Sequence, residues 1–186
     1  MVSDEQLVVE SLAGSTLAFA ELVERYQERL LRYLQTRATN RADAEDAVQD
    51  TFISAYRYLY SFNPRWRFST WIYRIAIRNV VRQSRDDVHD IETMVDEDAT
   101  DPLEECIVAS DRENVWLTAK RLLNQDAYSA MWLRYVEDMS IKEIARALDK
   151  TQSWTKVTLL RGRRSLSAEL SDGASEGARR ESYGRI

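Results

Sequence analysis

Residues 61–85 read SFNPRWRFSTWIYRIAIRNVVRQSR, and this stretch carries the features that point most directly to fold and function. Asn63-Pro64 interrupts the helical pattern, because proline disfavours the α conformation in the residue before it. A helix that Ser69 can cap is predicted after this break. Its two neighbouring faces would carry a row of arginines, Arg74, Arg78, Arg82 and Arg85, and a core-docking row, Ile72, Ile75, Ala76 and Val80.

The composition of this stretch favours nucleic-acid binding. It holds six arginines, five aromatic residues and no acid. Arginine neutralises phosphate, and aromatic faces accept unpaired bases at roughly 1–3 kcal/mol per stacked base. A solvated arginine row on an ordinary amphipathic helix is the alternative, but it explains neither the absence of acid nor the tryptophans beside the arginines.

The composition of the whole chain favours an all-α protein. It has 186 residues, with only five glycines and two prolines, which suits one domain or two small ones. No apolar run approaches the roughly 20 residues that cross a bilayer. The first residues, MVSDEQLVVESLAG, have acids where a signal peptide has lysine or arginine. We therefore expect a cytoplasmic protein without membrane insertion, and its one cysteine excludes an internal disulfide.

Charge is distributed unevenly along the chain. The net charge is −5, yet residues 61–85 and 140–166 form two basic islands. Residues 86–105, between the islands, hold ten acids and neither lysine nor arginine. Because charges are screened within about 8 Å at physiological salt, each island acts locally and not through the acidic whole.

Hydrophobic periodicity predicts the first domain over residues 1–85. Helices are expected at 4–12, 17–36 and 42–60, before the arginine helix. In the second of these helices the expected core row is Leu17, Leu22, Tyr26, Leu30, Tyr33 and Leu34. Residues 86–109 then have the composition of a flexible, self-repelling acidic linker.

The second domain is predicted over residues 110–168. Helices are expected at 111–123 and 126–137, followed by a short helix that a capping box, Ser140 to Glu143, would open. Three residues, Asp149 to Thr151, separate it from a helix over 152–168, and a joint so short is typical of a helix-turn-helix. Residues 169–186 are expected to be a disordered tail.

The second helix of this motif carries side chains that suit DNA in the major groove. They are Gln152, Ser153, Lys156, Thr158, Arg161, Arg163 and Arg164. A plain basic helical hairpin is the alternative.

A cluster of acids precedes the arginine stretch. Asp43, Asp46 and Asp50 share a helical face with Gln49 beside them. Because like charges repel, the face implies either a basic protein partner or simple solvation, and both remain open. Neither histidine nor a glycine-punctuated loop accompanies the acids, so we expect no metal.

No catalytic centre is predicted. His89 and Cys106 are the only residues of their kinds, and neither has partners for nucleophilic or zinc chemistry. No glycine loop that would cradle phosphate exists, so no cofactor is expected.

Five segments together resemble extracytoplasmic-function (ECF) sigma factors of the sigma-70 family. AFAELVERYQERLLRYL at 18–34, DAEDAVQDTF at 43–52 and FSTWIYRIAIRN at 68–79 resemble region 2. SIKEIARAL at 140–148 and KVTLLRGRRSL at 156–166 resemble region 4. The resemblance implies an alternative sigma factor, not an enzyme, that directs RNA polymerase core to promoters with −35 and −10 elements and helps to open the −10 element.

The resemblance also implies which residues meet which partner. The β′ clamp helices of the polymerase would dock on Asp43, Asp46, Gln49, Asp50 and Phe52. Loop 62–69 would capture an extruded −10 base, and the helix after it would track the strand. The −10 set is Phe62, Asn63, Arg65, Trp66, Arg67, Phe68, Ser69, Trp71, Arg74, Arg78, Asn79, Arg82 and Arg85.

Region 4 would read the −35 duplex, with the polymerase β flap as a further partner. The −35 set is Gln152, Ser153, Lys156, Val157, Thr158, Leu160, Arg161, Arg163 and Arg164. Asp149-Lys150 stands where the family usually has a glycine and an apolar residue, so the −35 sequence is not implied. An anti-sigma factor is also implied as a partner.

Two other functions fit parts of the sequence. A stand-alone helix-turn-helix regulator explains residues 110–168 but not the acidic face or the arginine stretch. A single-strand binder explains residues 61–85 but not the helix-turn-helix. Only the sigma factor should need polymerase core to bind promoter DNA tightly.

Overall fold

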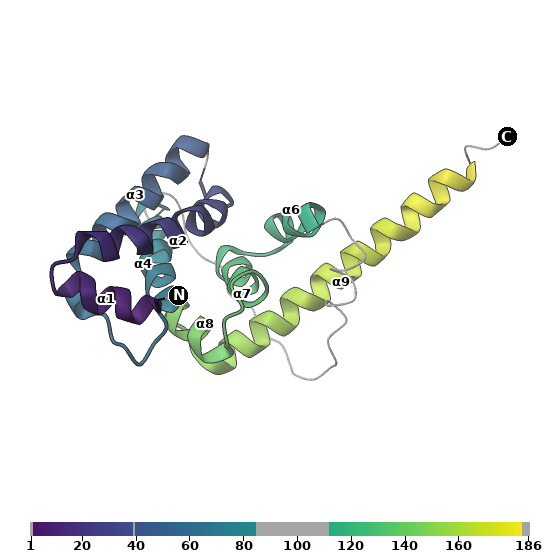
Figure 1. The fold of residues 1–186 in the computed structure, drawn as a ribbon. Helices are drawn as coiled ribbons and strands as arrows, with labels where there is room; N and C mark the ends of the chain where they lie inside the picture. Colours follow the sequence, from purple (N-terminus) through teal and green to yellow (C-terminus); the bar gives the residue numbers. More distant parts are fainter. Residues whose placement is uncertain (1, 39, 85–111, 184–186) are drawn as a thin grey trace. The chain divides into compact units, whose positions relative to one another are not determined.

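The computed structural model describes residues 2–38, 40–84 and 112–183, and of 80–84, 112–114 and 172–183 it describes the backbone alone. All regular structure in these ranges is helical, which confirms the all-α prediction (Figure 1). The described residues fall into two compact units, one within 1–92 and 142–150, the other within 93–141 and 151–186. The predicted acidic linker lies outside the described residues. No helix in the described ranges is long and apolar enough to cross a membrane.

The first unit is built around α2. Its elements are α1 (Asp4–Leu12), α2 (Thr16–Gln35), α3 (Arg41–Arg57), the short 3-10 helix η1 (Leu59–Ser61) and α4 (Phe68–Ser84). α2 packs against α1, α3 and α4, and α3 packs against α4. The first three helices begin where Ser3, Ser15 and Asn40 accept a hydrogen bond from a backbone N–H of the first turn.

The core of the first unit follows the predicted rows with two differences. Leu22, Tyr26, Leu30, Tyr33 and Leu34 are buried on α2, as predicted, but Leu17 is 82% exposed. Five residues before Leu22, Leu17 is rotated well away from the buried face. On α4 the buried row includes Tyr73 and Ile77, whereas Ile75 is half-buried. α4 also begins one residue before Ser69, which therefore lies inside the helix instead of capping it.

The second unit packs three helices together. They are α6 (Arg112–Leu122), α7 (Gln125–Tyr135) and α9 (Gln152–Tyr183). The α9 residues that face this core are Thr155, Leu159, Gly162 and Leu166. A Cβ on Gly162 would lie 3.2 Å from the Sδ of Met131, so glycine allows α9 to approach α7 closely here.

α9 is longer than the sequence predicted. The expected helix ended near residue 168 and a disordered tail followed, whereas the helix continues to Tyr183. Residues 165–171 contain helix formers such as Leu166, Ala168 and Glu169, and no proline ends the helix.

The joint between the predicted pair of DNA-binding helices has defined local geometry. α8 (Ile141–Leu148) ends at Asp149, whose φ of 61° lies in the left-handed region, and the N–H of Lys150 donates to the carbonyl of Ala145 at 2.9 Å. α9 then begins where the hydroxyl of Thr151 accepts a hydrogen bond from the N–H of Trp154 at 3.1 Å.

Candidate nucleic-acid interface

An aromatic cluster anchors the loop that leads into α4. Phe62, Phe68 and Trp71 lie edge to face or tilted, with ring centroids 5.7–6.0 Å apart. Phe68 also meets Tyr26 of α2 at 5.2 Å. Phe68 and Ser69 are buried. These two predicted −10 residues therefore lie in the core, where they position the loop.

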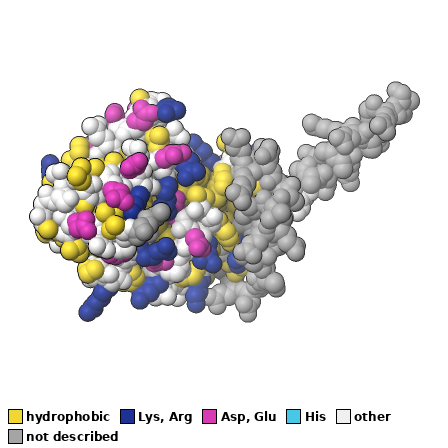
Figure 2. Space-filling view, viewed as in Figure 1, with side chains coloured by type: hydrophobic (Ala, Val, Ile, Leu, Met, Phe, Trp, Pro, Cys, Tyr) yellow, Lys and Arg dark blue, Asp and Glu magenta, His cyan; other side chains and the backbone are white. Residues whose placement is uncertain are grey.

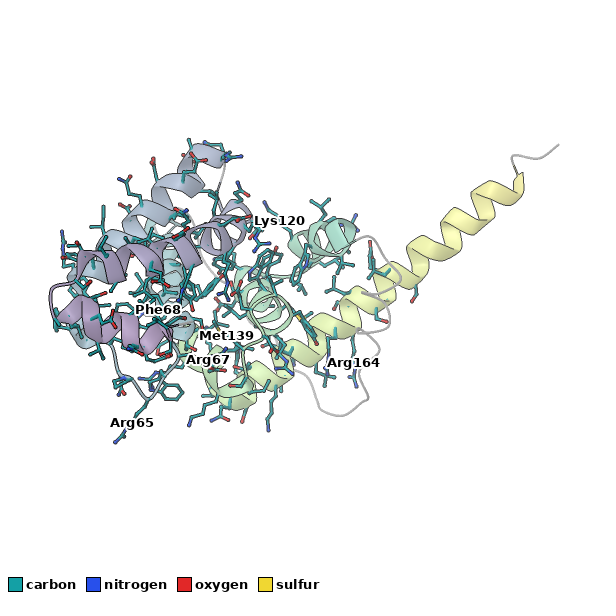
Figure 3. The ribbon with its side chains drawn as sticks, viewed as in Figure 1. Arg65, Arg67, Phe68, Lys120, Met139 and Arg164 are labelled. Atoms are coloured by element: carbon teal, nitrogen blue, oxygen red, sulfur yellow. The ribbon has the colours of Figure 1, made fainter. Side chains whose placement is uncertain are left out.

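The loop itself is a compact turn. The N–H of Trp66 donates to the carbonyl of Asn63 at 3.0 Å, and Pro64 occupies the second position, where its fixed φ suits a turn. The side-chain oxygen of Asn63 accepts a second hydrogen bond from the N–H of Arg65 at 3.0 Å. The turn therefore exposes the side chains of Arg65 and Arg67, and Arg65 projects outward (Figure 3).

A pocket opens beside this turn. Its walls include three aromatic residues, Tyr58, Trp66 and Trp71, and three polar ones, Asn63, Thr70 and Arg74. The hydroxyl of Thr70 and the Nε of Arg74 are buried and have no hydrogen-bond partner among the described residues. The aromatic walls beside polar side chains suit a flat ligand with polar edges.

The arginines of α4 are crowded. Burial, and then the neighbouring charge of Arg78, lowers the pKa of Arg74. Within the same unit the carboxylate of Asp149 accepts from Arg74 at 3.0 Å and from Arg78 at 3.1 Å. The two guanidinium groups thus share one anion, and a phosphate could serve them in the same way.

Residues of α8 also contact the loop within this unit. Arg146 lies over the ring of Trp66 at 4.1 Å and Lys142 at 4.9 Å, and the guanidinium of Arg67 is 3.9 Å from the carboxylate of Glu143. The indole of Trp66 therefore presents a face that attracts cations and planar groups.

The remaining predicted −10 residues are described in part. Asn79 is half-buried, and its amide nitrogen has no partner among the described residues. The side chain of Arg82 and all of Arg85 lie outside the described residues.

The predicted −35 residues on α9 fall into an exposed group and a half-buried group. Gln152, Ser153 and Lys156 are exposed in its first turns, and Arg164 is exposed further along (Figure 3). Val157, Thr158, Leu160, Arg161 and Arg163 are half-buried. The exposed end of α9 is therefore polar and basic, on the side opposite the buried row.

The acidic face of α3 is only partly as predicted. Asp43 forms a reciprocal cap with Asn40: its N–H donates to the Asn40 side chain, and its carboxylate accepts from the Asn40 amide at 2.9 Å. Phe52 is buried. Asp46, Gln49 and Asp50 are exposed, and neither Asp46 nor Asp50 pairs with any described residue. Figure 2 shows acidic side chains on the surface of this unit.

An apolar groove that the sequence analysis missed continues the acidic face. Phe19, Val23, Phe52, Ile53 and Tyr56 line it between α2 and α3. Ile53 and Tyr56 are 49% and 57% exposed although both are apolar. Positions 46, 49, 50, 53 and 56 share a helical face, so the spacing that revealed the acids could also have revealed these two.

No metal site is present among the residues that the structure describes, where no three His, Cys, Asp or Glu side chains come together. His89 and Cys106 lie outside those residues.

Comparisons with known proteins give the family. Residues 22–88 match Sigma-70 region 2, and residues 116–166 match Sigma-70, region 4. The ECF RNA polymerase sigma factor SigW of Bacillus subtilis is 30% identical over 173 residues, which cover 86% of this chain and 92% of SigW. The chain belongs to the ECF sigma factors of the sigma-70 family. An ECF sigma factor is an alternative factor for transcription initiation, and such factors are not catalytic.

Further relatives agree. The ECF RNA polymerase sigma-E factor of Haemophilus influenzae is 29% identical over 184 residues, 91% of this chain and 96% of that protein. Among solved structures, CnrH in complex with the cytosolic domain of CnrY has a TM-score of 0.65 at 24% identity, over 91% of this chain and 97% of CnrH. The sigma factor RpoE in complex with the anti-sigma factor NepR from Bartonella quintana has a TM-score of 0.63 at 21% identity, over 83% of this chain and 96% of that chain. Both share the fold of this ECF sigma factor.

Proposed function

We propose that this ECF sigma factor binds RNA polymerase core in the cytoplasm, directs it to promoters with −35 and −10 elements, and captures an unpaired base of the −10 strand. The observation that carries strand capture is the pocket beside the Asn63–Trp66 turn. It combines flat aromatic walls with polar side chains, which suits the stacking and edge contacts of a flipped base.

Capture would favour opening of the −10 element, because binding an unpaired base stabilises the unstacked state of the DNA relative to the duplex. Removing a base from the duplex costs a few kcal/mol, and stacking on an aromatic side chain returns roughly 1–3 kcal/mol. Contacts of Arg74 and Arg78 with phosphates would supply the rest, since two crowded guanidinium groups gain from a shared anion.

The proposed polymerase-docking surface consists of Asp46, Gln49 and Asp50 together with the apolar groove. Exposed carboxylates without a partner fit a basic surface, and exposed Ile53 and Tyr56 supply the apolar contact that charges alone lack. The partner would be the β′ clamp helices. Of the other two residues that the sequence analysis included, buried Phe52 would support this surface from within, and exposed Asp43 would support it through its cap with Asn40.

The exposed first turns of α9 would read the −35 duplex. Gln152 and Ser153 can reach base edges, and Lys156 can pair with a phosphate. The half-buried Val157, Thr158, Leu160, Arg161 and Arg163 are proposed as lesser contacts, with exposed Arg164 a further phosphate contact. The β flap of the polymerase would be this unit's protein partner.

An anti-sigma factor is proposed as a further partner. One similar structure is the sigma factor RpoE in complex with the anti-sigma factor NepR, and another is CnrH in complex with the cytosolic domain of CnrY. An inhibitor that covered the apolar groove would compete with the polymerase for the same surface.

The test of polymerase docking is co-purification with RNA polymerase core. The charge-reversed variant Asp46→Arg plus Asp50→Arg should lose stoichiometric binding. The control, Glu10→Arg plus Glu28→Arg, changes the charge equally at exposed sites on α1 and α2 and should bind as the wild type does. Binding retained by the first variant would refute the docking surface. No binding by the wild type would instead support a stand-alone DNA-binding protein.

A further inference from the structure

Two tyrosines beside the base pocket have little part in the core. Tyr58 follows the last residue of α3 and Tyr60 lies in η1, and they are 48% and 73% exposed, whereas Leu59 between them is buried. Hydrogen bonds hold this turn. The N–H and hydroxyl of Ser61 donate to the carbonyl of Tyr58 at 2.9 and 2.7 Å, and the N–H of Phe62 donates to that of Leu59 at 3.0 Å. An ordered turn therefore presents both rings to solvent.

The position of the two rings suits a base. Tyr58 is itself a wall of the pocket, and the ring centroid of Tyr60 lies 6.4 Å from that of Tyr58 with an interplanar angle of 54°. This separation is close to twice the roughly 3.4 Å spacing of stacked bases along a strand. A base could lie between the rings once Tyr60 turned nearer to parallel, and its high exposure leaves room for that rotation.

The charge around the pair also favours a nucleic-acid strand. No aspartate or glutamate occurs between Asp50 and Asp86, so both tyrosines lie within an acid-free run that extends beyond the basic island. Arg57 and Arg65 are exposed on either side of them in the sequence. Aromatic faces with nearby arginines are the usual platform for unpaired bases.

We propose that Tyr58 and Tyr60 form a second base-binding position, which holds the unpaired nucleotide next to the one in the pocket. The proposal rests on the strand capture described above and extends it from one nucleotide to two. Stacking tolerates any base, so this position adds affinity and not sequence preference, which is left to the polar groups of the pocket. Two held nucleotides would also oppose the return of the first base to the duplex.

The test uses the full chain bound to RNA polymerase core and a short fluorescent oligodeoxythymidine, with affinity measured by anisotropy over a range of salt concentrations. Tyr60→Ala should weaken binding by roughly 5- to 20-fold, and Tyr60→Phe, which keeps the ring, should stay within about twofold of wild type. The slope of log affinity against log salt should be unchanged in Tyr60→Ala, because a ring contact releases no counterion. The control is Leu17→Ala, which removes a large exposed apolar side chain that lines neither the pocket nor the groove and should have no effect.

A further variant separates this proposal from the proposed function. Trp66→Ala removes a wall of the pocket and should weaken binding if strand capture is correct. If Trp66→Ala weakens binding and Tyr60→Ala does not, the second position is refuted and capture stands. If neither variant weakens binding, or the wild type does not bind, both are refuted. If Tyr60→Phe loses as much affinity for the oligonucleotide as Tyr60→Ala does, stacking by the Tyr60 ring is refuted.

Discussion

The ring of Phe68 meets the ring of Tyr26 edge to face, with centroids 5.2 Å apart and planes at 69°. Phe68 begins the helix that carries the proposed −10 contacts, and Tyr26 lies in the middle of α2. The contact ties the loop proposed to capture a base to α2, the longest helix of its unit. Phe68 is thus a structural residue, whereas Trp66 and Trp71 of the same stretch line the pocket.

Replacing Phe68 should therefore destabilise the first unit. Phe68→Ala removes a fully buried ring, and such changes cost about 3–5 kcal/mol. Phe62→Ala removes a half-buried ring of the same cluster and should cost clearly less. Urea unfolding followed by circular dichroism measures both. An equal loss of unfolding free energy in the two variants would show that Phe68 does not anchor the loop.

Stability should fall at alkaline pH because of Tyr26. Burial, and then the hydrogen bond that its hydroxyl donates to Asp4, raises the pKa of Tyr26 above its usual value. A raised pKa favours the neutral form in the folded state, so this contribution is complete below the unfolded pKa of about 10 and is lost as the pH rises above it.

The measurement for Tyr26 is the urea midpoint at neutral pH and above about pH 10. Wild type should lose stability over this interval, and Tyr26→Phe should lose markedly less. Tyr60→Phe is the control, since it removes the hydroxyl of an exposed tyrosine outside the core and should leave the wild-type loss intact. The same loss in Tyr26→Phe would show that another group causes it.

Periodicity predicted the buried rows, but the roles of single residues required the structure. The spacing of Leu22, Tyr26 and Leu30 follows from the helical repeat, and these residues are buried as predicted. Asp43 shares its spacing with Asp46 and Asp50, yet it caps α3 together with Asn40. The spacing gives the face on which a residue lies, whereas the cap depends on where the helix begins.

The candidate pocket was predictable only in part. The aromatic and arginine composition of residues 61–85 indicated unpaired bases, and Asn63 and Trp66 are in the pocket. Tyr58 lies before that stretch, and the unpaired hydroxyl of Thr70 depends on how α4 packs. Composition cannot distinguish buried Phe68 from half-exposed Trp71, because tertiary contacts decide which ring faces the core.

The apolar groove should contribute to polymerase binding independently of the acids. Ile53→Ser removes an exposed apolar side chain from the proposed docking surface, and the Kd for core should rise by about tenfold if it lies near the centre of the interface. Leu17→Ser is the matched control, because Leu17 is even more exposed but does not line the groove. Titration of labelled variants with core measures both, and equal Kd values for wild type and Ile53→Ser would exclude the groove.

Lys156 should bind a phosphate of the −35 element and not a base. It is exposed in the first turns of α9, where its flexible ammonium can reach the backbone beside the groove that Gln152 and Ser153 would enter. Lys156→Ala should weaken holoenzyme binding to all promoters alike and lower the salt slope by about one, whereas Gln152→Ala should change the preference among −35 sequences. Lys120→Ala, on α6, is the control for loss of a lysine in the same unit and should leave both quantities unchanged. A change of sequence preference in Lys156→Ala, with an unchanged salt slope, would assign Lys156 to a base edge instead.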